Sequence, residues 1–525
     1  MSEASHIRST FKHALIYSGA NILAKAIGFI MLPVYAFYLR GEGYGIIGMI
    51  DVILSVMTLL IGYGISGAMR RFYFQKPSEH EKHVFVSTNI TLMILMVLAV
   101  TTPAIIFSEQ IAWLAFGKTG MGYYVMLALF TFIADLTARN AENYILILQK
   151  SVFYTSLSLV RLLIGLSLNI YLIVHLHLGV LGYLYSGLIV AVLFSIVMHG
   201  YALSHVGFHF RPADVREILA FSLPLLPGYV AMFFRNNTDR IMLRTYLGLA
   251  QLGAFEMLFK FATLIGVFVS EPFMKSWDIK RFEISHMPEG PSIMARVFTY
   301  QLALNMFVGL ILALEIPILL RILTPQEFWL SGGLAFLAVS SRIILDSYYQ
   351  FFFGLLHTKR TSYISMIQFV TAGLSVLLNW LLIKRYGLWG AVMASCVVNG
   401  IQSALGYVFA QRYYRIPYEW SKVVTILCLT CTLFFLIDMI ELEGTPVEAW
   451  LTSVLHTPVS AMLHMMHIDA IKNGKIAAYF IGNIPIIFEG GIKLVLAFAF
   501  LLTLPLCGIV PRQLYKNMQG TVETP

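Results

Sequence analysis

Opposite charges stand four residues apart at five places in apolar surroundings. Residues at this spacing share one face of a helix, so each pair can neutralise itself. A charge in the middle of a bilayer costs about 2.5–3.5 kcal/mol on insertion scales. Leucine side chains can pack helices together without that cost. We therefore expect some of these pairs to line water, although helix-to-helix packing is the simpler alternative for any one of them. The five pairs are Asp135/Arg139, Arg235/Asp239, Glu256/Lys260, Arg342/Asp346 and Glu489/Lys493.

Two further cations, Lys25 and Arg161, have no opposite charge at that spacing. An acid on another helix is one expected partner, with Asp51, Glu142 and Glu315 as the candidates. The alternative is that these cations face a polar cavity and bind a phosphate, since arginine grips phosphate with a two-pronged fork and lysine acts as a point charge. The predicted substrate-binding residues of such a cavity are Lys25, Arg235, Arg161, Arg342, Asp239 and Arg240.

Prolines and aromatic residues could complete such a site. Pro33 lies in one apolar run, and Pro224 and Pro227 lie in another. Proline removes a helix hydrogen bond, so these positions are candidate gating hinges, with a static kink as the alternative. Aromatic side chains near the charged stretch could stack on sugar rings, with plain packing as the alternative. These are Tyr229, Phe233, Phe234, Tyr348 and Tyr349.

Signatures of an enzyme or of a metal site are weak. The run Gly117–Thr119 resembles the end of a phosphate-binding loop, but Ala112 replaces its leading glycine. Cys428 and Cys431 have metal-like spacing inside an apolar run, where small apolar filling is the simpler interpretation. A His pair within His464–Asp469 lacks further ligands. We expect no enzyme activity, no cofactor and no metal.

Composition places these residues in a membrane. Of 525 residues, 58% are hydrophobic and 12% are charged, whereas soluble proteins have about 25% charged residues. The net charge of +9 is spread over short loops and forms no nucleic-acid motif, so nucleic acid is excluded as a partner. An integral membrane protein of all-α class follows.

About fourteen apolar runs are long enough to span a bilayer. Lys and Arg concentrate in alternate loops beginning with the N-terminus, which predicts a multi-pass protein of the inner (plasma) membrane with both termini in the cytoplasm. The outer loop 441–483 is long and is expected to lie at the interface. The runs begin near His13, Tyr44, Val84, Met121, Tyr154, Gly179, Glu217, Ala250, Ser292, Phe328, Ser362, Gly387, Trp420 and Ile484.

An internal repeat links two of the turns between these runs. YLRGEGYGIIGM (Tyr38–Met49) and YLGLAQLGAFEM (Tyr246–Met257) match at tyrosine, leucine, glycine and methionine with a constant offset of 208 residues. The same offset places Gly64 opposite Pro272, and a helix can bend at either residue. Six runs separate the copies, so the two halves are predicted to share one orientation in the membrane.

These segments resemble the polysaccharide-transport family of the multidrug/oligosaccharidyl-lipid/polysaccharide (MOP) exporter superfamily, the oligosaccharide flippases. The resemblance includes Asp239-Arg240 in LPLLPGYVAMFFRNNTDRIML and Lys260 in LGLAQLGAFEMLFK, while Arg40 replaces the family's usual glycine in LRGEGYG. It implies two pseudo-symmetric six-helix lobes around a central cavity, plus an extra helix pair. The lobes would be residues 1–210 and 211–415, and the pair would lie in 416–525.

The resemblance implies a flippase that moves a polyprenyl-diphosphate-linked oligosaccharide to the outer leaflet by alternating access, for surface polysaccharide export. Expected partners are the lipid-linked oligosaccharide, membrane lipids, a glycan polymerase and glycosyltransferases, and a monomer is expected. Three alternatives remain open. They are a cation-coupled multidrug antiporter, a flippase for a cell-wall precursor of the lipid II type, and, with less support, a membrane glycan polymerase.

Overall fold

A computed structural model describes residues 28–29, 31–61, 64–439 and 484–506. Every regular element in these residues is helical, and nine of the helices are long and apolar enough to cross a membrane. This confirms the predicted all-α membrane class. Most of the predicted first span, the metal candidate His464–Asp469 and the loop 441–483 lie outside the described residues. The chain forms two compact units, each described by itself below.

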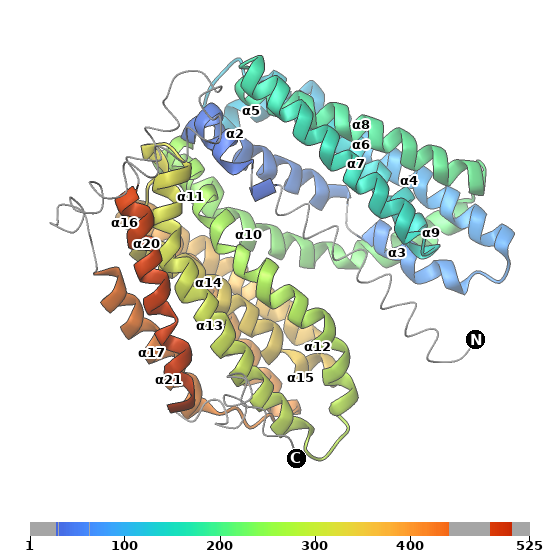
Figure 1. The fold of residues 1–525 in the computed structure, drawn as a ribbon. Helices are drawn as coiled ribbons and strands as arrows, with labels where there is room; N and C mark the ends of the chain where they lie inside the picture. The colour runs from blue at the N-terminus through green and yellow to red at the C-terminus, as the bar shows by residue number, and fades with distance from the viewer. Residues whose placement is uncertain (1–27, 30, 62–63, 440–483, 507–525) are drawn as a thin grey trace. The chain divides into compact units, whose positions relative to one another are not determined.

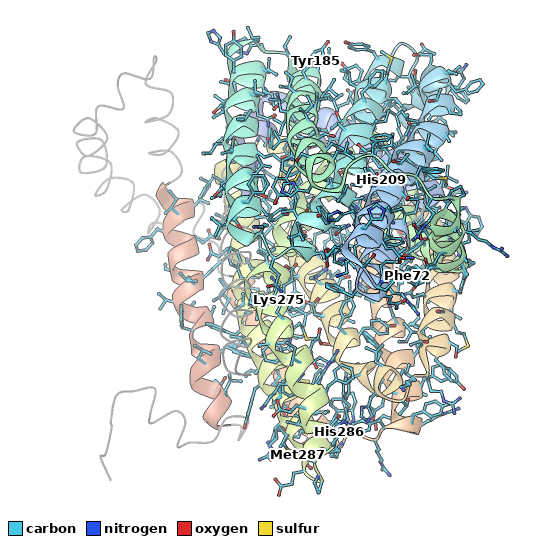
Figure 2. The ribbon with its side chains drawn as sticks, turned by 90° about the vertical axis from the view of Figure 1, so that its right-hand side faces the viewer. Phe72, Tyr185, His209, Lys275, His286 and Met287 are labelled. Carbon is cyan, nitrogen blue, oxygen red and sulfur yellow. The ribbon has the colours of Figure 1, made fainter. Side chains whose placement is uncertain are left out.

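Unit 1 comprises residues 1–256 and 368–388. In it α6 packs between α4 and α8 (Figure 1). Tyr185 on α8 lies at one end of this unit, and Phe72 and His209 lie toward the other (Figure 2). Its helices are α2 (Leu32–Ile61), α3 (Gly64–Phe72), α4 (Glu79–Ile106), α5 (Ser108–Phe116), α6 (Gly122–Ile147), α7 (Ser151–Asn169), α8 (Gly179–Val206), α9 (Pro212–Ser222) and α10 (Leu226–Leu247).

Unit 2 comprises residues 257–367 and 389–525, and α11 (Leu249–Ala262) and α16 (Thr361–Tyr413) belong partly to each unit. The long helix α13 is central to unit 2 and packs against α14, α17 and α20. Lys275 lies within α12, and His286 and Met287 follow its end (Figure 2). The other helices are α12 (Glu271–Ile284), α13 (Gly290–Leu323), α14 (Gly332–Phe351), α15 (Phe353–His357), α17 (Trp420–Asp438), α20 (Ile484–Ala497) and α21 (Ala499–Leu506).

Two of these helices each contain a sharp kink where the sequence predicts one span to end and the next to begin. In α2 the kink is at Arg40, with φ 62° and ψ 179°. In α16 it is at Gly387, with φ 58° and ψ −132°. The predicted starts of spans near Tyr44 and Gly387 therefore fall just after or at a break in the helix.

The internal repeat is visible in the backbone. Gly248, 208 residues after Arg40, has φ 86° and ψ 176°, close to the values at Arg40. Gly179 and Gly387, again 208 residues apart, have φ 54° and 58°. Positive φ is rare outside glycine, so agreement at two separate pairs is strong support for the repeat. The lobe boundaries predicted from the family resemblance remain a prediction, because the two compact units follow contacts and not the repeat.

The two copies of the repeated turn contact each other within unit 1. A Cβ added at Gly45 would lie 1.9 Å from the carbonyl oxygen of Leu249. A Cβ added at Gly253 would lie 2.0 Å from the carbonyl oxygen of Gly41. Gly45 matches Gly253 and Gly41 matches Leu249 under the 208-residue offset, so the contact is self-complementary, as across a two-fold axis. Glycine is required at both close approaches.

Helices α9 and α17, whose first residues are also 208 positions apart, each begin at an ion pair. Before α9, Arg211 Nε donates to Asp214 Oδ2 at 2.8 Å. Before α17, Lys422 Nζ donates to Glu419 Oε1 at 2.7 Å. The positions correspond at an offset of 208 residues, but the order of the charges is reversed. The spacing of the pair is thus repeated along with the helix start.

Candidate substrate site

Two cavities in unit 1 share one wall residue, Asp51 on α2. The larger cavity, of about 510 Å³, lies among α2, α6, α7 and α8. The smaller cavity, of about 260 Å³, lies between α2 and α10. Ser55, one turn after Asp51, also lines the smaller cavity, and its hydroxyl donates to the Asp51 carbonyl at 2.7 Å. Because a carboxylate is costly in a bilayer, its presence on both cavities marks this region as the candidate substrate site.

The larger cavity contains an ion pair between two helices. Arg161 Nη2 on α7 donates to Asp135 Oδ1 on α6 at 2.6 Å, and both side chains are about one-third exposed. The Arg161 guanidinium also lies 4.5 Å from the ring centroid of Phe194, within cation–π range. The pair therefore holds a charged guanidinium at the cavity wall, with surface left for a ligand.

This pairing corrects the prediction for Asp135, and it confirms that Arg161 pairs with an acid on another helix, although not with one of the three candidates. Asp135 was expected to pair with Arg139 on its own helix, and it pairs with Arg161 instead. The expected partners of Arg161 did not include Asp135, and one of them, Glu142, accepts a hydrogen bond from the Tyr154 hydroxyl at 2.9 Å. The spacing rule identifies side chains on one face, whereas helix packing decides which residue of a neighbouring helix faces them.

The smaller cavity is lined by polar and aromatic side chains of α10. Its α10 residues include Tyr229, Phe233, Asn236 and Arg240. Arg235 does not line it, but Arg235 Nη1 donates to Asn236 Oδ1 at 3.0 Å. The predicted role of Arg235 as a direct ligand remains untested, and its visible contact positions the amide of Asn236. Phe234, the neighbour of Phe233, is 45% exposed and lines neither cavity.

Arg240 connects α10 to α11 through Glu256. Arg240 Nε lies 2.5 Å from Glu256 Oε1, and Nη2 donates to Oε2 at 3.3 Å. Arg240 Nη1 donates to the carbonyl of Asn236 at 2.7 Å, and its backbone N–H donates to Asp239 Oδ1 at 2.8 Å. Arg240 is therefore held by several acceptors while it lines the smaller cavity. The prediction that Glu256 pairs with Lys260 missed this contact, because the partner comes from another helix.

The predicted pairs Arg342/Asp346 and Glu489/Lys493 form as expected. Arg342 Nη2 lies 3.2 Å from Asp346 Oδ1 on α14, and Lys493 Nζ lies 2.8 Å from Glu489 Oε1 on α20. Arg342 lines neither cavity of unit 1. The predicted cavity residue Lys25 lies outside the described residues.

The candidate hinges lie at irregular points of their helices. The chain makes a turn at Met31, just before Leu32 and Pro33 open the regular part of α2. Pro224 lies in a short 3-10 helix, Leu223–Leu225, and Pro227 opens α10 directly after it. These breaks agree with the bends expected at the prolines. Movement at them remains a prediction.

The sequence predicted a positively charged cavity, and the described lining residues give a more balanced set. Asp51 and Asp135 stand against Arg161 and Arg240. The polar groups that sequence reasoning missed are uncharged, and their only signal was their occurrence in apolar runs. They include Ser55, Asn169, Tyr183, Asn236 and Asn237. Within the described residues no three His, Cys, Asp or Glu side chains gather as metal ligands, and Cys396, Cys428 and Cys431 are free thiols.

A family model described as polysaccharide biosynthesis protein matches residues 10–277, about half of the chain. The chain belongs to this family. A search of curated proteins finds no match. The family match confirms the resemblance inferred from the sequence segments at both repeated turns.

Solved structures share the fold of this polysaccharide biosynthesis family member. The lipid II flippase MurJ in an inward closed conformation has a TM-score of 0.68 and 13% identity, covering 94% of this chain and 99% of that chain. The Vibrio cholerae MATE transporter VcmN in its bent form has a TM-score of 0.53 and 14% identity, covering 80% and 98%. An inward-facing multidrug resistance MATE transporter of the MOP superfamily has a TM-score of 0.53 and 13% identity, covering 79% of this chain and 95% of that chain. These transporter structures therefore share the all-helical membrane fold that the sequence predicted.

Proposed function

We propose that this protein is a flippase for a polyprenyl-diphosphate-linked oligosaccharide and moves it from the inner to the outer leaflet by alternating access. The observation that carries the proposal is the pair of cavities that share Asp51 as a wall residue, in a member of the polysaccharide biosynthesis family. Their walls combine carboxylate, amide, guanidinium and aromatic groups. Sugar hydroxyls hydrogen-bond to the first two kinds of group, and sugar rings stack on aromatic faces.

The two guanidiniums give the diphosphate a place to bind. Arg161 contacts one carboxylate, that of Asp135, and Arg240 contacts those of Asp239 and Glu256. Both still line a cavity. A diphosphate can accept further hydrogen bonds from their free N–H groups, since arginine has five donors. Lys25, predicted to face the same region, would add a point charge. The substrate would thereby meet cations beside sugar-binding groups.

A reconstituted flipping assay tests this function. Purified protein is placed in liposomes with a fluorescent polyprenyl-diphosphate oligosaccharide, and a membrane-impermeant quencher reports which leaflet the lipid occupies. We expect Phe233→Ala, which removes a cavity wall, to slow flipping by about tenfold, a factor equivalent to about 1.4 kcal/mol. Phe234→Ala is the matched control, because Phe234 is the neighbour of Phe233 in the sequence and lines neither cavity. Equal rates for both variants would contradict the assignment of this cavity.

A cation-coupled drug antiporter is the second candidate, and one observation favours it. In the larger cavity the described charged residues are two carboxylates, Asp51 and Asp135, and one guanidinium, Arg161. An excess of acid suits a cationic drug or a coupling ion. The same liposomes therefore receive a cationic dye with an imposed proton or sodium gradient, and separately a lipid II-type precursor. Transport of the dye alone would overturn the flippase proposal, and transport of the precursor alone would restrict it to cell-wall synthesis.

A further inference from the structure

The turns that precede α7 and α16 have the same backbone in the two copies of the repeat. Gln149 in the first turn and Lys359 in the second have φ 55° and 58°. The next residue, Lys150 or Arg360, donates its backbone N–H to the carbonyl five residues before it, at 3.3 and 2.8 Å. Corresponding residues of the turns are 210 positions apart, and the offset returns to 208 at the helix break that follows. Their side chains can therefore be compared position by position.

A ring in the first turn of the following helix belongs to a cluster of three rings in each copy. The centroids of neighbouring rings lie 4.8 and 4.3 Å apart in the first copy, and 5.1 and 5.6 Å apart in the second. The Tyr413 hydroxyl donates to the Tyr363 hydroxyl at 2.9 Å, so the two ends of α16 meet in this cluster. The rings are Phe153, Tyr201 and His205 in the first copy, and Tyr363, Phe409 and Tyr413 in the second.

The second cluster carries two arginines that the first cluster lacks. The guanidinium carbon of Arg360 lies 5.3 Å from the ring centroid of Tyr413, and that of Arg412 lies 5.7 Å from the ring centroid of Phe409. Both distances are within cation–π range. Both arginines act electrostatically on the Tyr413 hydroxyl, so two positive charges converge on one point. In the first copy the position of Arg412 is occupied by Ser204.

The two guanidiniums are available to a ligand. Within the part of the chain that the structure describes, neither arginine forms an ion pair, and two acids of the neighbouring helices are paired with other bases. These acids are Glu283, which pairs with Lys280, and Glu419, which pairs with Lys422. Both arginine side chains are exposed. A guanidinium that lies over a ring uses its face there and keeps the N–H donors of its edge for an anion.

The position of this cluster in the fold indicates which anion it meets. The helix Thr361–Tyr413 is apolar enough to span a membrane, and both of its ends lie here. His357, just before the turn, lies 5.5 Å from His286, which is at one end of unit 2 (Figure 2). Arginine and tyrosine at the ends of membrane helices lie level with lipid headgroups, and basic pockets between such helices bind anionic headgroups. Arginine holds a phosphate with two parallel hydrogen bonds.

We propose that Arg360 and Arg412 bind the phosphate of an anionic phospholipid headgroup at the point where the two ends of α16 meet. Because Tyr413 donates to Tyr363, the hydrogen of the Tyr363 hydroxyl can point to a further phosphate oxygen. The bound headgroup would join the start of α16 to its end. None of these residues lines either cavity of unit 1. The proposal concerns binding alone, so it does not depend on what the protein transports.

Native mass spectrometry of the full chain in detergent tests the site without any transported substrate. The probe is phosphatidylglycerol, compared with phosphatidylcholine, whose headgroup has no net charge. We expect the native chain to bind phosphatidylglycerol about tenfold more tightly. Arg360→Gln and Arg412→Gln should each weaken that binding about fivefold, a factor that corresponds to about 1 kcal/mol for each basic residue at a membrane surface. Neither change should alter the binding of phosphatidylcholine.

Lys150→Gln is the matched control, because Lys150 occupies the position of Arg360 in the first copy. This variant should keep the full affinity for phosphatidylglycerol. Equal binding of the two lipids, or an equal loss in the control variant, would indicate unspecific attraction and overturn the proposal. Loss of phosphatidylglycerol from the native chain in about 10 mM inorganic phosphate would make this a site for free anions. Unchanged binding in both arginine variants would leave the arginines to an acidic protein partner, and either of these results would also overturn the proposal.

Discussion

The turns at Arg40 and Gly248 have the same backbone but carry different side chains. Each joins two membrane helices and has positive φ with ψ near 180°. Glycine adopts this conformation freely, whereas for arginine it is strained. A few residues later the two copies agree again, because Gly45 and Gly253 both meet a carbonyl oxygen of the opposite copy. Where the backbones touch, both copies have glycine. Where the turn is open, the first copy has arginine and the second has glycine.

The charges show a stronger difference between the copies. Glu256 on α11 matches Gly48 on α2, and a Cβ added at Gly48 would lie 3.0 Å from Glu256 Cγ. Asp51, the residue shared by both cavities, matches Phe259 in the second copy. The repeat therefore supplies a symmetric frame, and each copy carries an ionisable residue that the other copy lacks. A binding site for an asymmetric molecule needs such a departure from symmetry.

The largest effect should follow from removing the charge that only the second copy has. Glu256→Ala removes the nearer carboxylate from the Arg240 guanidinium in a largely buried position and leaves only that of Asp239, 3.6 Å away. Breaking a buried pair costs about 3–5 kcal/mol, and we expect about 3 kcal/mol because Arg240 stays 26% exposed. The free energy of unfolding in mixed detergent micelles measures it.

The double variant Arg240→Met/Glu256→Leu is the control for that measurement. Replacing both partners by apolar groups of similar size should restore most of the lost stability. Flipping by the double variant should still be slow, since Arg240 lines the smaller cavity. A double variant as unstable as the single one would mean that Glu256 acts through packing against Gly48 and not through its charge.

The next effect concerns the contact that both copies share. Gly45→Ala and Gly253→Ala each place a methyl group about 2 Å from a carbonyl oxygen, so α2 and α11 must separate. Overpacking of this kind costs about 1–3 kcal/mol. Because the contact is self-complementary, the two variants should lose similar amounts of stability. Gly200→Ala on α8, where nothing lies within 4 Å of the added Cβ, should be neutral. Unequal losses would contradict the two-fold relation.

Much of this frame could be predicted from the sequence, because hydropathy and glycine placement follow from the membrane and from backbone sterics. The starts of spans near Tyr44 and Gly387 fall at breaks that the structure also has. The partners of the charges could not be predicted as well. Arg342 and Asp346 pair within one helix, but Asp135 and Glu256 pair across helices. Periodicity fixes the face of a helix, and only tertiary packing fixes the residue opposite that face.

A smaller effect should come from making the two open turns alike. Arg40→Gly removes the strained φ of 62° and gives the first copy the residue of the second. Relief of this strain should stabilise the protein by about 1 kcal/mol, less the added flexibility of the unfolded chain. The reverse change, Gly248→Ala, should destabilise it by a similar amount. Tm of the two variants, measured side by side, checks the sign of both changes. A loss of stability in Arg40→Gly would show that the exposed arginine side chain makes a contact that outweighs the strain.

The smallest effect concerns the two ion pairs at the starts of α9 and α17, in which the acid and the base have exchanged positions. Burial alone would raise the pKa of Glu419, but hydrogen bonds from Lys422 and from the Thr299 hydroxyl outweigh it and lower the pKa. A carboxyl group with a lowered pKa stabilises the fold above its unfolded pKa of about 4.3, and that stabilisation is lost as pH falls through the folded pKa.

Between pH 6 and pH 3, Tm of the native chain should therefore fall further than Tm of Glu419→Gln. The difference should correspond to less than about 1 kcal/mol, because the pair is partly exposed to solvent. Arg211→Gln tests the matching position of the first copy, where the carboxylate is Asp214 and the substitution removes the cation. That variant should keep most of its pH dependence, since Lys76 Nζ also donates to Asp214 Oδ1 at 3.0 Å. If Tm fell equally for Glu419→Gln and for the native chain on acidification, the start of α17 would be held by its packing on α13 and not by the charge of Glu419.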